Sequence, residues 1–395
     1  MNQPIVLPSL CAALLASLTP AAWALDYQVH GFLTQGGVYS TGNELFGHST
    51  TGSAAYFEAG LNGTVSLGPN LLVSGQVFAR DAGATDNAKP RLDFGLVDYR
   101  PVNDADSSLG VRLGRVKNPY GLFNETRDSV FTRPGILLPQ SVYFDGEGIR
   151  ELLFSSDGGQ LYGSQRFGEH DVSVVGGGAF QRRLSKDEQR EFGLVLPGDL
   201  SLDDFWYGRL FDEYREGRWR GGVTYARADL RFLPDHGVPL DARSAIDLYI
   251  LSLRYNAEHF ALTGEYLRDD TDTRSNFLPG GKSSGDGFYA QGEWFIDPHW
   301  TLLTRYDGTF TDRNDRDGRH YAKQTPPPGA PAPVRTSRFA HDLMLGGHWL
   351  YDQHWGVWAE SHWIYGTATV SPADNIGRTP DAHWALFLLM GGYRF

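Results

Sequence analysis

The segment YFEAGLNGTVSL, residues 56–67, alternates apolar and polar side chains, and LLVSGQVFAR, residues 71–80, repeats the alternation after a turn at Gly68-Pro69-Asn70. In the first segment one face carries Phe57, Ala59, Leu61, Val65 and Leu67, and the opposite face carries Glu58, Asn62, Thr64 and Ser66. Strands of soluble sandwiches average about five or six residues. Strands of about ten residues with one apolar and one polar face are typical of barrels that cross a membrane.

The same alternation recurs along the whole chain and predicts sixteen strands. They lie near residues 26–38, 54–67, 71–81, 90–100, 109–116, 159–167, 171–181, 205–215, 218–229, 245–255, 259–269, 286–296, 300–311, 338–350, 355–366 and 382–395. The connections alternate between short turns, such as GPN, FGEH and DPH, and long loops. The long loops fall at 39–53, 82–89, 117–158, 182–204, 230–244, 270–285, 312–337 and 367–381. This sorting predicts an all-β fold, a transmembrane antiparallel 16-stranded β-barrel with a long third external loop.

Residues 1–24 have the pattern of a signal peptide, with an apolar stretch followed by the small-x-small sequence Ala22-Trp23-Ala24. The barrel then occupies residues 25–395, in which no run approaches the ~18 apolar residues of a spanning helix. In a membrane such a chain can satisfy its backbone only as a closed barrel. We therefore expect export to the bacterial outer membrane. The only cysteine, Cys11, lies in the signal segment, so the mature chain has no thiol chemistry.

The chain ends in AHWALFLLMGGYRF, with Tyr393 and Phe395 alternating at the terminus. This ending resembles the signal that the bacterial barrel-assembly machinery reads, and the resemblance implies recognition through Phe395. The last segment is apolar on both faces, because Trp384, Leu386, Leu388 and Met390 alternate with Ala385, Phe387 and Leu389. The sequence therefore leaves open which of its faces points into the barrel.

The longest connection, residues 117–158, contains KNPYGLFNETRD and RPGILLPQSVYFD and carries enough apolar side chains to pack a small core. Loops beyond ~12–15 residues are usually functional or disordered. Here the chain resembles the Gram-negative outer-membrane porin superfamily, with a layout similar to phosphate-selective-type porins. The resemblance implies that this third loop folds into the lumen as a constriction. The alternative is a loop that only supports the rim or a neighbouring subunit.

Placing the polar faces inward predicts a basic wall over the third to ninth strands and an acidic wall over the tenth to fifteenth. Charge in a pore wall sets ionic preference. The predicted pore-lining or constriction residues are Arg80, Arg91, Arg112, Arg127, Arg133, Asp145, Glu147, Arg150, Arg218, Arg220, Glu265, Glu293 and Asp307. The alternative is that a wet lumen merely tolerates these charges, and a register error of one residue would invert any strand's assignment.

The sequence indicates no catalytic site, cofactor or metal site. It has no GxSxG elbow or ordered triad, and its C-terminal histidines lack the spacing of metal ligands. A net charge of -12 gives no support for nucleic-acid binding. The favoured function is a porin for passive diffusion of small hydrophilic solutes or ions. The alternatives are a barrel-based lipase or protease and a closed structural or adhesive barrel. Expected partners are outer-membrane lipid and lipopolysaccharide, the assembly machinery, and other copies of the chain in a homotrimer.

Overall fold

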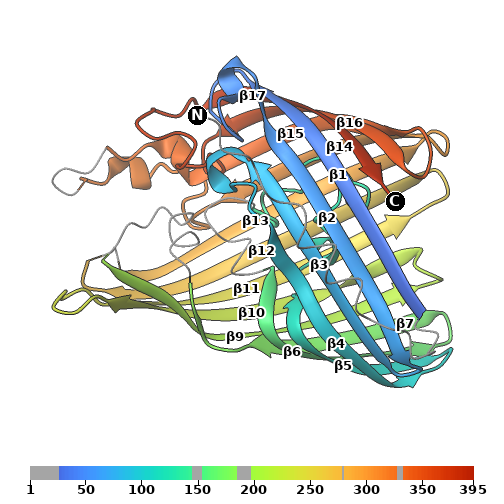
Figure 1. The fold of residues 1–395 in the computed structure, drawn as a ribbon. Coiled ribbons are helices and arrows are strands. Elements are labelled where there is room, and N and C mark those ends of the chain that lie inside the picture. The colour runs from blue at the N-terminus through green and yellow to red at the C-terminus, as the bar shows by residue number, and fades with distance from the viewer. Residues whose placement is uncertain (1–25, 145–153, 185–196, 278–279, 327–331) are drawn as a thin grey trace, which may run out of the picture.

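The computed structural model describes residues 26–144, 154–184, 197–277, 280–326 and 332–395, and it consists of one antiparallel sheet rolled into a barrel (Figure 1). The predicted signal segment at residues 1–24 lies outside the described residues. The first strands are β1 (Asp26–Ser40), β2 (Ser53–Gly68), β3 (Leu71–Ala82), β4 (Arg91–Asn103), β5 (Ser107–Lys117), β6 (Ser155–Phe167), β7 (His170–Ala179) and β9 (Gly198–Tyr214). A two-residue strand, β8 (Arg182–Arg183), adds only a short pairing to β9.

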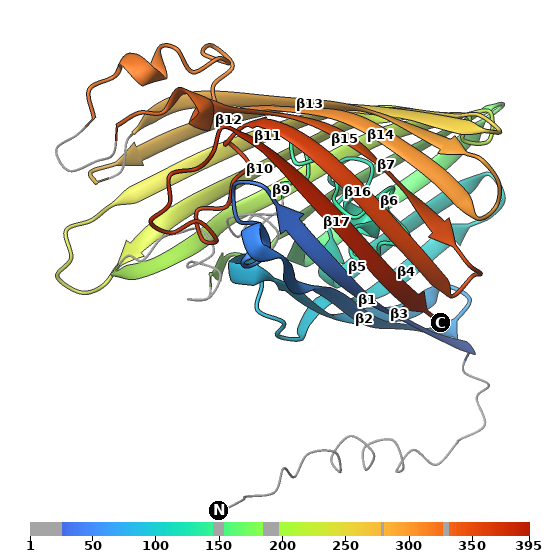
Figure 2. The ribbon, with the colours of Figure 1, turned by 90° about the horizontal axis from the view of Figure 1, so that it is seen from above.

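The second half of the barrel is formed by β10 (Trp219–Pro234), β11 (Ala242–Asn256), β12 (Phe260–Ser275), β13 (Gly281–Phe295), β14 (Trp300–Phe310), β15 (Phe339–Leu350), β16 (Trp355–Gly366) and β17 (His383–Arg394). The sheet closes because β1 pairs with both β2 and β17. Apart from β8, sixteen antiparallel strands thus surround the lumen, and the predicted fold class is confirmed. The strands tilt strongly with respect to the barrel axis (Figure 2).

Short and long connections lie at opposite ends of the barrel, as predicted. The turns at one end are short, whereas the loops at the other end are long and contain the short 3-10 helices η1 (Ser49–Thr51), η2 (Gly83–Thr85), η3 (Asn124–Thr126), η4 (Tyr321–Lys323) and η5 (Arg335–Arg338). Among the described residues no helix is long and apolar enough to cross a bilayer. Figure 2 shows the long loops gathered at one end, away from the C-terminus.

Side chains alternate across the wall with the predicted period of two. Outward-facing residues such as Leu61, Leu113 and Leu251 are large, apolar and more than half exposed. Inward-facing residues of the same strands, such as Glu58 on β2 and Ser252 on β11, are buried. Aromatic pairs lie beside the short turns, including Tyr255 with Phe260, Trp300 with Trp349, and Trp355 with Tyr393. An apolar outer band with aromatic residues near its edge is the surface that a bilayer requires.

The structure also settles the facing of β17. Leu386, Leu388 and Met390 point inward and are buried, while Phe387 and Leu389 are exposed on the outer face. The inward set packs in one core cluster with apolar residues of the third long loop, among them Ile136 and Leu137. Both faces of β17 are apolar because one faces outward and the other is covered by this loop.

Candidate functional site

The third long loop, L3 (residues 118–154, of which 118–144 and 154 are described), packs against the inner face of the barrel on two opposite sides. Its Tyr120, Phe123 and Tyr143 belong to a cluster with inward residues of β9, β10, β11 and β13. Its Val130, Ile136 and Leu137 belong to a second cluster with inward residues of β1, β2, β16 and β17. L3 therefore spans the lumen, which is why parts of the inner wall are apolar rather than polar.

Two carboxylates of the inner wall hold L3 by its backbone. The N–H groups of Ile136 and Leu137 donate to Glu360 at 2.6 and 3.1 Å. The N–H groups of Gln140 and Ser141 donate to Asp307 at 2.6 and 3.2 Å. Hydrogen bonds to a charged acceptor are roughly twice as strong as neutral ones. These carboxylates thus satisfy backbone donors that would otherwise be buried without partners.

A third carboxylate, Glu265 on β12, accepts four hydrogen bonds. They come from the Tyr143 hydroxyl at 2.5 Å, the Tyr289 hydroxyl at 2.7 Å, the Ser252 hydroxyl at 2.5 Å and the N–H of Leu122 at 3.0 Å. Burial and the neighbouring charge of Glu265 raise the pKa of Tyr143 well above its ordinary value. The phenol therefore stays protonated and donates. Glu265 thus binds two parts of L3, at Leu122 and at Tyr143.

The side of L3 that faces β2 and β3 is held by a buried ion-pair group. The guanidinium of Arg133 makes bonds of 3.0 and 2.7 Å to both carboxylate oxygens of Glu58 on β2, a bidentate geometry. Arg80 on β3 lies 3.8 Å from the same carboxylate. Arg127 stacks over the ring of Phe154 at 3.7 Å, near the point where L3 joins β6. All three arginine side chains are thus engaged in fixing L3 rather than exposed to the lumen.

The inner-wall arginines of the other side are partly exposed and lie beside carboxylates. Arg112 lies 3.5 Å from Asp98 and stacks on Tyr162, while Arg220 lies 3.1 Å from Glu213. Other such pairs include Arg91–Asp86 at 2.8 Å, Arg209–Glu125 at 2.5 Å and Arg254–Glu293 at 2.7 Å. The arginines named here from the predicted basic wall are thus paired with carboxylates of neighbouring strands, of the β3–β4 loop or of L3.

A cavity of about 650 Å³ lies between L3 and the inner wall near the C-terminus. Most of its lining residues are polar or charged, among them His30, Gln76, Lys117, Asp128 and Arg394, and the rings of Phe32, Phe94 and Phe395 complete the lining. Lys117 contacts both Asp128 of L3 and Asp93 of β4. Such a lining is compatible with water, in contrast to the apolar clusters on which L3 rests.

The predicted residues therefore occupy several environments. Arg127 and Arg133 belong to L3, Glu265 and Asp307 bind L3, and Arg80 pairs with Glu58, the carboxylate that binds Arg133. Arg91, Arg112, Arg220 and Glu293 lie on the inner wall. Asp145, Glu147 and Arg150 lie outside the described residues.

The prediction that Arg218 lines the pore is corrected by the structure. It lies in the turn that precedes β10, is exposed, and donates to the Tyr255 hydroxyl at 3.1 Å. The strand begins one residue later than predicted, because residues 215–217 form a turn with positive φ angles.

The predicted pore-lining residues do not include Glu58 and Glu360, which bind L3 as closely as the predicted residues do. Both lie on the polar face of a recognised strand, and this inward position was the only signal that could have found them.

Several solved structures match this barrel over nearly its whole length. The anion-selective porin from Comamonas acidovorans matches with a TM-score of 0.57 and 14% identity, covering 94% of this chain and 100% of that one. The chain has the fold of the outer-membrane porins. This porin fold also matches the outer membrane channel DcaP of Acinetobacter baumannii, with a TM-score of 0.54, 11% identity, and coverage of 94% and 97%. A trimer form of OmpT, an outer membrane protein of Vibrio cholerae, matches with a TM-score of 0.53, 11% identity, and coverage of 94% and 100%. The sequence matches no protein-family model and no curated protein.

Within the described part of this porin fold, one histidine is surrounded by carboxylates. His362 contacts Asp342 through Nδ1 at 2.7 Å and Glu360 through Nε2 at 3.2 Å. Because both ring nitrogens are engaged, His362 has none left to activate a serine or water nucleophile. In the same described ranges no group of three or more His, Cys, Asp or Glu side chains is placed to hold a metal ion.

Proposed function

We propose that the protein is an outer-membrane porin through which small hydrophilic solutes or ions diffuse passively, with L3 as the constriction. The observation that supports this most is that L3 packs against the inner wall of a closed barrel. The outer surface of the same barrel carries an apolar band. The water-compatible cavity beside L3 agrees with it. The proposal includes export by residues 1–24, assembly through Phe395, and contact of the outer loops with lipopolysaccharide.

The proposal is tested in planar bilayers with the purified full-length barrel. We expect discrete conductance steps from the wild-type protein. Their absence under conditions where the protein is folded would favour a closed structural barrel. Hydrolysis of phospholipid or peptide by the same preparation would favour an enzyme.

Arg112 tests the contribution of the inner wall to ion preference. Its side chain is partly exposed, and its loss leaves Asp98 with less positive charge beside it. Arg112→Ala should therefore shift permeability toward cations, by about twofold in the anion-to-cation ratio. Arg218→Ala removes the same charge in an exposed turn and should cause a smaller shift. Equal shifts in the reversal potentials of both variants would contradict a role for the inner wall.

The outer face of β5–β9 supports self-association as part of the proposal. Arg115 and Asp157 form an ion pair of 3.3 Å on the outward row that also contains Leu113. The half-exposed Asp157 carboxylate, two residues from the loop end of β6, offers a polar contact to a neighbouring protein surface. Nearby, outward Gly176 and Gly208 form the floor of a shallow hollow. We propose that a second copy covers this face, as in a homotrimer.

Gly176→Trp would fill that hollow and should reduce the oligomer to monomer in unheated gel electrophoresis and light scattering. Val357→Trp adds the same ring to the outer face of β16, on the other side of the barrel, and should leave the oligomer intact. An oligomer that withstands Gly176→Trp but dissociates with Val357→Trp would place the interface elsewhere.

A further inference from the structure

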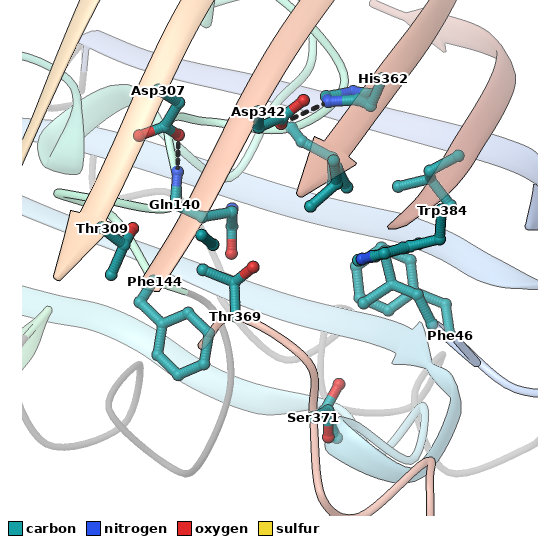
Figure 3. Close-up of a pocket in the computed structure, with 16 residues that line it drawn as sticks. Phe46, Gln140, Phe144, Asp307, Thr309, Asp342, His362, Thr369, Ser371 and Trp384 are labelled. Atoms are coloured by element: carbon teal, nitrogen blue, oxygen red, sulfur yellow. Dashed lines mark hydrogen bonds and ion pairs between the residues drawn. The ribbon is translucent and has the colours of Figure 1, made fainter. Parts of the chain in front are cut away.

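The seventh long loop, L7 (residues 311–338), joins β14 to β15 and folds over the outer face of the barrel. Thr309 of β14 and Asp342 of β15 line a pocket inside the barrel (Figure 3). Because successive side chains of a strand point to opposite faces, Phe310 and Phe339 lie on the outer face. These two residues are nevertheless only 8% and 2% exposed. A part of the outer face at the loop end is therefore covered by protein.

Two arginines of L7 lie over these rings. The guanidinium carbon of Arg316 is 5.1 Å from the centre of the Phe310 ring. That of Arg335 is 5.8 Å from the centre of the Phe339 ring. Cations at such distances are attracted to the faces of aromatic rings. L7 thus places positive charge against the outer surface of β14 and β15.

An ion pair attaches L7 to a further strand on the outer face. Arg316 pairs with the buried carboxylate of Asp286 on β13. Asp286 lies on the outer face because the next residue, Gly287, faces Ser141 of L3 inside the barrel. L7 therefore lies against the outside of β13, β14 and β15, whereas L3 lies inside the lumen.

The rings that L7 covers adjoin a row of aromatic side chains on the outer face of β13 to β17. The His341 ring of this row lies 5.4 Å from the rings of both Phe310 and Phe339. The row consists of Phe288, Tyr306, His341, Tyr365 and His383, with successive ring centres 6.0, 6.1, 6.3 and 4.3 Å apart. Aromatic side chains with polar tips favour the headgroup level of a bilayer. L7 thus stands at the height of the headgroups of the outer leaflet.

L7 is also the most cationic of the eight long connections. Its five arginines and one lysine exceed its three aspartates by +3, whereas the net charges of the other seven range from -2 to +1. The Arg319 side chain is 71% exposed and Lys323 is exposed as well. Residues 327–331, which lie outside the described part of L7, carry no charge. A chain with a net charge of -12 thus carries a basic loop where the lipid headgroups begin.

We infer that L7 binds the phosphate groups of lipopolysaccharide, through Arg335, Arg338, Arg319 and Lys323. Arginine and lysine are the usual phosphate-binding side chains, and cations near an anionic lipid surface are attracted to it. The inference rests on the proposed outer-membrane location. It deepens the proposed contact with lipopolysaccharide by assigning it to one loop and to one chemical group. Binding requires no conduction, so it is measured separately from channel activity.

The test is native mass spectrometry of the full-length, detergent-solubilised protein with bisphosphorylated lipid A, the phosphate-bearing anchor of lipopolysaccharide. We expect the wild type to bind this probe at least about tenfold more tightly than lipid A without its phosphates. The double variant Arg335→Gln, Arg338→Gln should bind the bisphosphorylated probe at least about tenfold more weakly than the wild type, because it removes two cations of L7.

Arg243→Gln, Arg274→Gln is the matched control. It removes the same charge from two exposed, paired residues at the loop ends of β11 and β12 and should change binding by less than about twofold. A second L7 variant, Arg319→Gln, Lys323→Gln, alters only exposed side chains and should weaken binding at least about threefold. It keeps the test decisive if the first L7 variant fails to fold.

Three results would overturn the inference. They are equal binding of lipid A with and without phosphates, equal weakening by the L7 variants and the control, and dissociation of an oligomer by the L7 variants with lipid A binding unchanged. The last result would assign L7 to a contact between subunits. Absence of conductance steps with retained, phosphate-dependent lipid A binding would contradict the porin and leave the assignment of L7 standing. Conductance without such binding would do the reverse.

Discussion

Replacing Glu360 and Asp307 together by alanine is expected to release L3 from the inner wall and to widen the channel. The double variant removes the acceptors of four L3 backbone N–H groups, those of Ile136, Leu137, Gln140 and Ser141. Each buried donor left without a partner costs about 1–3 kcal/mol, and L3 can regain hydrogen bonds only by moving into water. Single-channel conductance should rise by about twofold, with larger current noise.

Glu213→Ala is the matched control for this experiment. It also removes an inner-wall carboxylate, but Glu213 pairs with Arg220 of the neighbouring strand and makes no described contact with L3. Its conductance should stay close to that of the wild type. If the double variant conducts like Glu213→Ala, L3 does not narrow the channel.

Leu389→Arg should destabilise the barrel strongly. Leu389 lies midway along β17 on the outer face and is 59% exposed in the absence of lipid. An arginine at the middle of the bilayer costs about 2–4 kcal/mol on the lipid face of such barrels, whereas near the interface the cost falls to about 0–1 kcal/mol. The free energy of unfolding in lipid vesicles, measured by urea titration with tryptophan fluorescence, should fall accordingly.

Ile296→Arg provides the depth control, because Ile296 is also exposed and apolar but follows the last residue of β13 beside a short turn. It should cost far less than Leu389→Arg. Equal costs at the two positions would show that the outer band does not lie in a bilayer.

Most of the fold could be predicted from sequence because two local signals extend over the whole chain. Alternation identifies each strand, and the length of each connection identifies the end of the barrel at which it lies. Errors stayed at the ends of strands, as at Arg218, where a turn with positive φ at Arg215 and Glu216 delays β10. Hydrogen-bonded turns of this kind leave little trace in a hydrophobic pattern.

The arrangement around L3 could be predicted only in part, because its contacts join residues far apart in sequence. Glu360 binds a backbone N–H that lies 224 residues earlier, and Glu58 binds Arg133 75 residues later. The sequence places Glu58 on an inward polar face, but it does not show whether water or L3 meets that face. For the same reason the inward leucines of β17 were ambiguous until L3 was seen to cover them.

Limited trypsin digestion of the folded wild-type barrel, read by mass spectrometry, tests most directly whether L3 lies inside the lumen. Arg127 in L3 is 1% exposed, whereas the Arg319 side chain in the seventh long loop is 71% exposed. We expect rapid cleavage after Arg319 and none after Arg127, and we expect the Glu360→Ala, Asp307→Ala double variant to gain the second cut. Cleavage of the wild type after Arg127 at the rate seen after Arg319 would contradict the placement of L3 inside the barrel.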